Sequence, residues 1–378
     1  MAIHHPLIIT ATLDIGGLES YLVRLLETID RSRFAPAIMY EGRGEDAYLG
    51  RLAKMDIPIV RRCYGKSIFG FLARFERLVE EHSVDIVCDF RGDMAGPVLR
   101  WAKKLGVASR VAMYRNAADK YERTYFNMSA ARFFNGLVLG SATAITGNTS
   151  AVLDYHFQTK KKWRKDGRFQ VVHNGVDLAA LSRKKGRNSL RQELGIGERE
   201  YLIGHVGRFV EEKNHEGLIS SFELVSNLHP QARLVMIGDG ALRPEIEKLV
   251  EELGLKEKVV FAGTRKEVHE MLAGLDAFVF PSKSEGMPNA LVEAMAAGLP
   301  FVASNIAQIK EIVPKEMWGQ LADSADVDGM AARICKMIEQ PGRAEKIGKR
   351  AEEWAEKQYS IQQSVEKMTD LWVAPLSK

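Results

Sequence analysis

Short runs of apolar residues alternate with longer amphipathic segments along the whole chain. The runs contain few polar residues, which is typical of strands buried on both faces of a parallel sheet, and the segments between them predict the helices of βαβ units. In the first half, helices such as 18–28 and 69–81 separate expected strands at residues 7–11, 35–40, 57–60, 86–89, 110–113, 142–146 and 170–172. In the second half we expect strands at 201–206, 233–237, 258–261, 277–280 and 300–303.

A basic, serine-containing stretch at residues 178–190 separates the two series of strands. The fold class is therefore α/β, with two doubly wound domains expected at residues 1–180 and 181–358. In such folds ligands bind outside the carboxyl ends of the strands, so we expect a cleft between the two sheets. The tail predicts two further helices with a break near Tyr359, and the last segment, 359–378, is expected to return to the first domain.

The composition is that of an ordinary globular protein. Of the 378 residues, 46% are hydrophobic and 27% are charged, which excludes a disordered, collagen-like or coiled-coil chain. Cys63, Cys88 and Cys335 lie far apart, which excludes a zinc finger or disulfide framework and indicates a reducing compartment. No apolar run has the length of a membrane-spanning helix, and residues 7–11 are too short for a signal peptide, so we expect a cytoplasmic protein.

The positive charge is concentrated in the first half of the chain. Residues 1–180 hold 26 Lys and Arg against 19 Asp and Glu, whereas residues 181–378 hold 27 against 30. The basic runs at 160–165 and 183–187 are either solvated connections or docking segments for an anionic membrane surface or nucleic acid. Only Trp163 is interleaved with them, so nucleic acid is not expected.

A membrane surface would suit the first basic run. Trp163 and Phe169 would sit at the interface beside the cations. The stretch 132–139 would add apolar contact there, or else pack in the core.

The strongest chemical motif spans residues 281–300. It predicts a strand, a polar loop and a helix that opens at Pro288-Asn289, where unpaired N–H groups form an anion site. Glu285 in the loop and Glu293 one turn into the helix can line one pocket. A carboxylate repels phosphate but accepts hydrogen bonds from sugar hydroxyl groups. The simpler alternative is that both acids favour the positive end of the helix dipole.

This stretch resembles the Glu-x7-Glu signature of the retaining family 4 glycosyltransferases, which have the two-domain GT-B fold. The resemblance implies that Glu285 approaches the donor sugar and that Glu293 binds the nucleotide ribose. It also implies that the helix start holds the diphosphate and sugar, at Gly286, Met287, Pro288 and Asn289.

Three further segments of the second domain resemble the same family. Gly207-Arg208 and Lys213 look like the pair of cations that grips the donor diphosphate, where they would stabilise the charge of the leaving group. Gly238 lies in a family turn, and the segment ending at Arg265 is where the base would be read. Gly238 and Gly240 begin a dinucleotide fingerprint, but Arg243 interrupts it, which argues against an NAD enzyme.

The resemblance is thinner in the first domain. Gly16 and Gly17 precede Leu18-Glu19 and match the family's Gly-Gly-x-Glu loop, where the backbone approaches the donor phosphates or the acceptor, although a tight strand–helix turn would look identical. Many relatives carry histidine after the fourth or fifth strand. This chain has Arg91 and Arg115-Asn116 there, and these are the acceptor-side candidates.

No metal site or cofactor is expected. The only Asp-x-Asp, Asp326-Val327-Asp328, starts an expected helix, where a capping role is the better interpretation. The motifs as a whole predict a retaining glycosyltransferase that uses a nucleotide-sugar donor. A UDP-sugar is expected before a GDP-sugar. The expected acceptor is a glycan or a lipid-linked glycan of cell-surface polysaccharide synthesis. Such an enzyme could work at the inner face of the plasma membrane.

Two alternatives remain open. A nucleotide-sugar epimerase would need its own acid–base carboxylates and histidine in the cleft, and the sequence offers no such set. A non-catalytic, membrane-docking subunit would have no use for the combination of Arg208, Lys213, Glu285 and Glu293.

Overall fold

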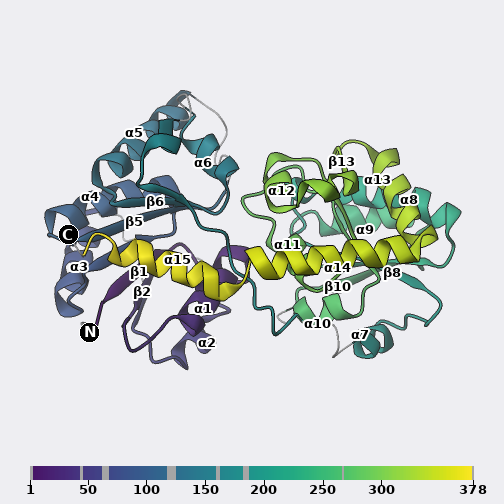
Figure 1. The fold of residues 1–378 in the computed structure, drawn as a ribbon, viewed down its shortest axis with the longest axis horizontal. Coiled ribbons are helices and arrows are strands. Elements are labelled where there is room, and N and C mark those ends of the chain that lie inside the picture. The colour runs from purple at the N-terminus through teal and green to yellow at the C-terminus, as the bar shows by residue number, and fades with distance from the viewer. Residues whose placement is uncertain are drawn as a thin grey trace. The chain divides into compact units, whose positions relative to one another are not determined.

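Two parallel sheets, each covered by helices on both faces, make up the computed structural model (Figure 1). It describes residues 3–42, 46–61, 68–116, 125–158, 162–181, 187–265 and 268–376. The chain divides into unit 1, Met1–Gly175 with Ile361–Lys378, and unit 2, Val176–Ser360. The chain passes from unit 1 to unit 2 after Gly175 and returns to unit 1 after Ser360. The two expected domains end a few residues from these points, at 180 and 358. Part of the expected linker, 182–186, is outside the described residues.

Unit 1 has a seven-stranded sheet in the order β3-β2-β1-β4-β5-β6-β7, with every pair parallel. Its strands are β1 (Pro6–Thr10), β2 (Ala37–Tyr40), β3 (Ile59–Arg61), β4 (Ile86–Asp89), β5 (Ser109–Tyr114), β6 (Ala144–Gly147) and β7 (Phe169–Val171). Its helices are α1 (Gly17–Thr28), α2 (Leu49–Ala53), α3 (Ile68–Glu81), η1 (Gly92–Ala95), α4 (Gly96–Lys104), α5 (Tyr125–Ser141), α6 (Ser150–His156), η2 (Lys162–Lys165) and α15 (Ile361–Val373).

Unit 2 has a six-stranded parallel sheet in the order β10-β9-β8-β11-β12-β13. Its strands are β8 (Tyr201–Val206), β9 (Ala232–Ile237), β10 (Val259–Gly263), β11 (Ala277–Phe280), β12 (Phe301–Ser304) and β13 (Leu321–Ala322). Its helices are α7 (Arg187–Glu193), η3 (Glu211–Lys213), α8 (His215–Leu228), α9 (Arg243–Glu252), α10 (Val268–Ala273), α11 (Asn289–Ala296), α12 (Ala307–Ile312), η4 (Lys315–Gln320), α13 (Val327–Glu339) and α14 (Pro341–Gln358).

The strands are apolar throughout because both of their faces are buried. In β11, Ala277 and Val279 contact one hydrophobic cluster while Phe278 and Phe280 contact the other, and all four are almost fully buried. The strand expected at 277–280 has these bounds, and most other expected strands differ from the observed ones by one or two residues. β13 was not predicted, because two residues are too short to show a pattern.

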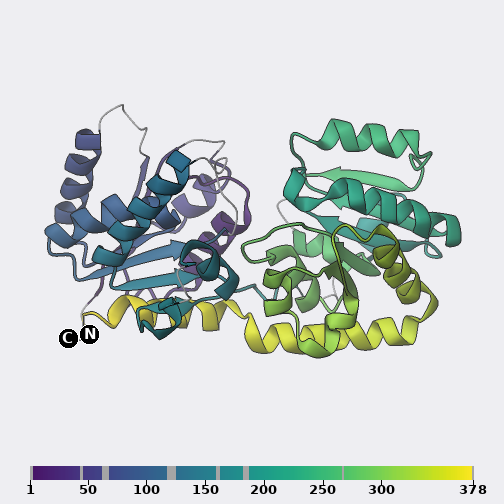
Figure 2. The same cartoon turned by 90° about the horizontal axis from the view of Figure 1, so that it is seen from above.

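The last helix of the chain packs into unit 1. In Figure 2 the yellow α15 and the blue α3 and α4 lie on opposite faces of the unit 1 sheet. Trp372 is fully buried against Phe34, with ring centroids 5.9 Å apart, and the Tyr21 hydroxyl lies 3.0 Å from Ser364 Oγ. The expected break between the tail helices falls at residues 359–360.

Candidate functional site

The strand order of unit 2 reverses between β8 and β11, which are neighbours in the sheet but not in sequence. The chain after one of these strands continues to one face of the sheet, and the chain after the other continues to the opposite face. Open α/β sheets bind ligands beyond the carboxyl ends of two such strands. The segments that the sequence selects, 207–214 after β8 and 281–288 after β11, are these two loops.

Backbone and amide hydrogen bonds join the two loops. The Lys283 amide donates to the Glu212 carbonyl at 2.7 Å. Asn214 Nδ2 donates to the carbonyls of Pro281 at 3.2 Å and Ser324 at 2.8 Å, so one buried side chain holds the loops after β8, β11 and β13 together. Asn214 has φ 54, in the left-handed region that asparagine tolerates better than most residues. Sequence reasoning assigned no role to this residue.

An ion pair forms where the joined loops meet. Lys213 Nζ lies 2.6 Å from Glu285 Oε1 and 5.1 Å from the centre of the Phe280 ring. Only 9% of the Glu285 side chain is exposed. An ammonium group has three N–H donors, and one donor to Glu285 leaves two that can bind phosphate oxygens. The structure thus brings together two of the three residues that the sequence selects as catalytic.

Arg208, the third, lies on the same edge and is exposed. Its guanidinium forms no ion pair with any described residue. The backbone beside it is tightly packed: a Cβ on Gly238 would lie 2.0 Å from the Gly207 carbonyl oxygen, and Gly238 has φ +141. The missing Cβ at Gly238 therefore lets the backbone after β9 approach the backbone at Gly207, next to Arg208.

The helix after β11 begins at Asn289, as the motif predicts, with Pro288 as its N-cap residue. Met287 and Pro288 are buried, and Glu293 is half-buried one turn into the helix. The N-terminus of α11 therefore faces the carboxyl edge that carries Lys213 and Glu285.

Two buried histidines lie behind the ion pair and were missed by sequence reasoning. The His205 ring is 5.0 Å from the His215 ring, which stacks on Phe209 at 4.1 Å. His205 Nδ1 is 3.0 Å from the Val279 carbonyl oxygen, whereas His205 Nε2 and both His215 nitrogens have no hydrogen-bond partner among the described residues. Burial, followed by the neighbouring His215, lowers the pKa of His205 well below its usual value. Burial and the charge of Lys213 lower the pKa of His215 to about 4. Both rings are therefore neutral near pH 7.

Arg265 is held by neighbouring groups. Its Nη2 donates to Glu193 Oε1 at 2.6 Å and its Nε to the Ala262 carbonyl at 3.0 Å. These contacts occupy the Arg265 side chain, and the backbone at the nearby Gly263 has φ +66.

Unit 1 reverses its strand order between β1 and β4. Gly16 and Gly17 follow β1 and open α1, where a Cβ on Gly16 would lie 2.4 Å from Glu19 Oε2. Glu19 also accepts from Thr12 Oγ1 at 2.9 Å. The Glu19 carboxylate thus folds back over the helix start, beside the backbone of Gly16.

Arg91 follows β4 and is held by two carboxylates. Its Nη2 lies 2.6 Å from Asp89 Oδ2 and its Nη1 lies 3.1 Å from Glu41 Oε1, with only 6% of the side chain exposed. The acids neutralise the charge that made Arg91 an acceptor-side candidate. In the structure, Arg91 stabilises the loop after β4 through its bonds to Asp89 and Glu41.

Arg115 is buried without a carboxylate partner among the described residues. It donates to Asn174 Oδ1 and lies over the rings of Tyr21, at 4.6 Å, and Phe90, at 5.5 Å. Burial lowers the pKa of this guanidinium. Arg115 therefore links β5, α1 and the chain before the crossover to unit 2.

Asn116 is the exposed member of the acceptor-side set, and a histidine lies beside it. His156 Nε2 is 2.9 Å from the Asn116 carbonyl oxygen, and the His156 ring is 4.7 Å from that of Tyr114. His173, two residues after the end of β7, hydrogen-bonds the Asn148 carbonyl at 2.8 Å. The sequence indicated no histidine after the fourth or fifth strand. His156 reaches the end of β5 from a helix, and its 40-residue separation from Asn116 hid this contact.

The structure corrects the interpretation of the first basic run. Trp163 and Phe169 are buried in the core of unit 1, and Trp163 Nε1 donates to Asp154 at 3.0 Å, so neither ring can lie in a membrane interface. Arg164 and Arg168 pair with Asp154 and Asp166 at 2.8 Å. Lys160 and Lys161 lie outside the described residues. In the described parts of the chain, no helix is both long and apolar enough to cross a membrane.

Asp326 caps α13, as the sequence predicts: its Oδ1 accepts from the Gly329 amide at 2.8 Å. Across the described ranges, no three histidine, cysteine or acidic residues come close enough together to hold a metal ion.

Residues 186–354 match the family model of glycosyl transferases group 1. The match lies within unit 2 and covers less than half of the whole chain. The putative glycosyltransferase EpsF of Bacillus subtilis is 32% identical over 205 residues, 54% of this chain and 53% of that protein. The UDP-Gal:alpha-D-GlcNAc-diphosphoundecaprenol alpha-1,3-galactosyltransferase of Escherichia coli is 29% identical over 176 residues, 46% of each chain. The chain thus spans about half the length of these relatives.

Solved structures extend the likeness to both units at the level of the fold. Anabaena HepE in complex with UDP-glucose has a TM-score of 0.82 and 21% identity, over 97% of this chain and 99% of that one. The lipopolysaccharide glycosyltransferase WaaG has a TM-score of 0.75 and 19% identity, over 98% and 100%. The fold is thus the GT-B fold, with two Rossmann-like units that each contain a parallel sheet.

Proposed function

We propose that this protein transfers a sugar from a UDP-sugar to an acceptor in polysaccharide or glycan synthesis, with retention at the anomeric carbon. The observation that carries the proposal is the Lys213–Glu285 ion pair at the point where the sheet of unit 2 reverses, with Arg208 exposed on the same edge. The likeness to HepE, crystallised with UDP and with UDP-glucose, supports UDP as the nucleotide.

In this proposal, Lys213 and Arg208 bind the diphosphate. As the glycosidic bond breaks, the bond electrons pass to the β-phosphate oxygen, and fixed cations at that position lower the barrier. Glu285 keeps Lys213 in place and offers its second oxygen to a sugar hydroxyl. Glu293 binds the ribose, and the N-terminal amides of α11 face the phosphates.

A carboxylate that accepts from the Lys213 ammonium is not a free nucleophile. We therefore infer a mechanism in which no covalent sugar–Glu285 intermediate forms. The acceptor hydroxyl attacks from the face that the diphosphate leaves and passes its proton to the departing β-phosphate oxygen. No metal ion is required, because two cations and a helix end neutralise the leaving group.

The acceptor is proposed to bind at the carboxyl edge of unit 1, near Asn116, His156 and His173. The name of the galactosyltransferase from E. coli states a lipid diphosphate acceptor for that protein, which suggests a lipid-linked acceptor here. The α5 helix exposes Phe133 and Leu139 beside Arg132, a combination that suits an anionic membrane.

The test is a transfer assay with UDP-sugars and GDP-sugars against lipid-linked glycans, with the anomeric configuration of the product read by NMR. We expect UDP release that depends on acceptor, an α-linked product from an α-linked donor, and unchanged rates in EDTA. Inversion of configuration would contradict retention, and loss of activity in EDTA that Mg²⁺ restores would contradict the metal-free mechanism. No binding of any nucleotide would overturn the proposal as a whole.

A further inference from the structure

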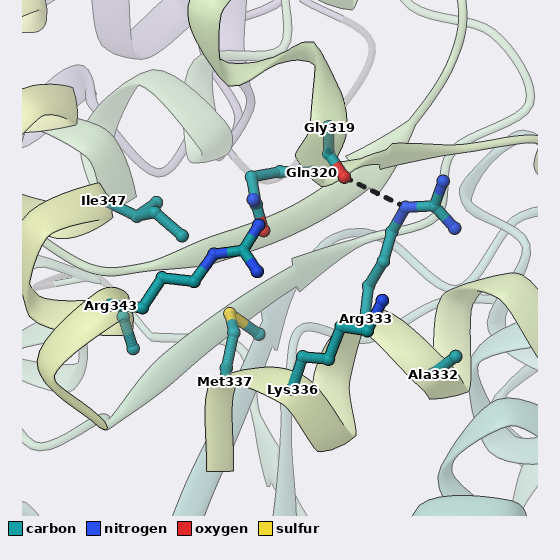
Figure 3. Close-up of a pocket in the computed structure, with 9 residues that line it drawn as sticks. Gly319, Gln320, Ala332, Arg333, Lys336, Met337, Arg343 and Ile347 are labelled. Atoms are coloured by element: carbon teal, nitrogen blue, oxygen red, sulfur yellow. Dashed lines mark hydrogen bonds between the residues drawn. The ribbon is translucent and has the colours of Figure 1, made fainter. Parts of the chain in front are cut away.

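A basic cavity lies in unit 2 between the end of α13, the start of α14 and the residues before β13. Its volume is about 150 Å³, and its lining includes Gln320, Arg333, Lys336 and Arg343 but no acidic residue (Figure 3). A cavity of roughly this size accepts a molecule as large as benzene, so a tetrahedral oxyanion fits.

The cavity is separate from the proposed donor site. Gly319 and Gln320 precede β13, whereas Lys213 and Glu285 follow β8 and β11. Because all strands of this sheet are parallel, the two sets of residues lie at opposite edges of it.

The cations around the cavity are not neutralised by the protein. Arg333 donates from Nε to the Gly319 carbonyl at 3.1 Å and from Nη1 to the Gly329 carbonyl at 2.8 Å, both uncharged acceptors. Within the described ranges no ion pair joins Arg333, Lys336 or Arg343 to a carboxylate. Unit 2 as a whole holds 25 Lys and Arg against 29 Asp and Glu, so this local excess runs against its net charge.

Helix electrostatics explain only part of this arrangement. Lys336 lies in the last turn of α13, where a cation is favourable. Arg343 lies in the first turn of the 18-residue α14, which has no acidic residue there, so its charge opposes the helix dipole. An anion beside Arg343 would reverse this unfavourable interaction.

Gln320 adds an uncharged hydrogen-bonding group to the lining of the cavity. This residue is only 8% exposed, and its side-chain amide has no hydrogen-bond partner in the described part of the chain. Gln320 and Arg343 both extend into the cavity that they line (Figure 3). The amide can therefore donate to, or accept from, a group bound in the cavity.

We propose that this cavity binds a phosphate group, held by Arg333, Lys336 and Arg343 and hydrogen-bonded by Gln320. The ligand is a phosphate monoester or inorganic phosphate, and the site is distinct from the nucleotide-sugar site. Bound there, phosphate would join α13, α14 and the start of β13.

The experiment is calorimetric titration with inorganic phosphate at constant ionic strength, in an R208Q/K213Q background that removes the cations proposed for the donor diphosphate. We expect binding that Arg343→Gln weakens by about tenfold or more, as expected for loss of a charge-assisted hydrogen bond. Arg350→Gln is the matched control, because this exposed arginine lies on the same helix outside the cavity. Lys336→Gln is the second variant, since an exposed lysine can be replaced without disturbing the fold.

A second arm separates a soluble from a lipid source, by sedimentation with phosphatidylcholine vesicles that contain phosphatidic acid. Binding that is lost in R343Q or K336Q and kept in R350Q supports the site, whether it is seen by calorimetry or by sedimentation. Binding of inorganic phosphate in the calorimeter indicates a soluble ligand, and binding to the vesicles indicates a lipid headgroup. Equal binding by all variants, or binding by none, would overturn it.

Discussion

Lys213 Nζ and Glu285 Oε1 lie 2.6 Å apart, on two loops that are 72 residues apart in sequence. The pair is mostly buried, and breaking it by removing one partner leaves the other charge partly buried and uncompensated. The contact depends on the hydrogen bonds of Asn214 and of the Lys283 amide, which fix the spacing of the loops.

We expect Lys213→Gln to lower turnover about 100-fold, because a cation at the leaving diphosphate is lost. Steady-state transfer rates at saturating donor measure this. Lys283→Gln, an exposed lysine of the neighbouring loop, is the control and should retain the wild-type rate. Turnover within twofold of wild type in K213Q would place the diphosphate elsewhere.

Arg208→Gln should lower turnover by a similar factor without lowering the free energy of unfolding, since its exposed guanidinium has no ion-pair partner among the described residues. Parallel assays of activity and urea unfolding distinguish this from a folding defect. Arg199→Gln, an exposed arginine before β8, should change neither. A rate like that of wild type would exclude Arg208 from the site.

Glu293→Ala should weaken the binding of UDP by about 1–3 kcal/mol, through loss of hydrogen bonds to the ribose. Calorimetric titration with UDP measures this loss. Titration with pyrophosphate is the comparison, because pyrophosphate contains no ribose and its affinity should not change. Glu316→Ala, at an exposed position of η4, controls for the loss of one negative charge. Equal weakening for pyrophosphate would show that Glu293 acts on the phosphates instead.

The pKa of His215 predicts acid sensitivity of unit 2. The pKa is about 4 in the folded chain and about 6.5 when unfolded, so the unfolded chain binds more protons between these values. The free energy of unfolding therefore falls as the pH drops through this window, by about 2 kcal/mol at pH 5 from this group alone. Urea unfolding should show a smaller loss between pH 7 and pH 5 for H215Q than for H82Q, a control at a partly exposed position. Identical losses would mean that His215 titrates normally.

Membrane docking is now expected from α5 rather than from Trp163. Phe133 is 64% exposed, and Phe133→Ser should reduce sedimentation with vesicles that contain anionic lipid. Leu228→Ser, which changes an equally exposed apolar residue of unit 2, should not. Moderate salt should release the wild type. Undiminished sedimentation of F133S would exclude α5 as the contact.

The two sheets could be predicted because each strand is a run of apolar residues. Such a run can be recognised from consecutive residues, without knowledge of which distant segments it contacts. The loops at 207–214 and 281–288 could also be placed, since each directly follows a strand. What the sequence could not show was which polar groups meet. Arg91 is held by two acids, Arg115 is buried against the Tyr21 ring, and Trp163 is in the core, although all three looked available for ligands or membranes.

His205 and His215 were overlooked for a related reason. A histidine inside a strand or a helix start looks structural, and only the packing of Phe209 against His215 shows that the rings form a buried pair. The cavity at Gln320 and Arg343 was hidden because its residues come from three elements, none of which carries a recognisable motif.

The position of α15 has a consequence for synthesis on the ribosome. Met368 and Trp372 are fully buried in unit 1, so the first unit lacks part of its core until residues 361–373 have been made. By then unit 2 has been translated completely and can have folded. Until α15 arrives, the sides of Tyr21 and Phe34 that contact Ser364 and Trp372 are uncovered, and they form an apolar surface that chaperones for unfolded chains would bind.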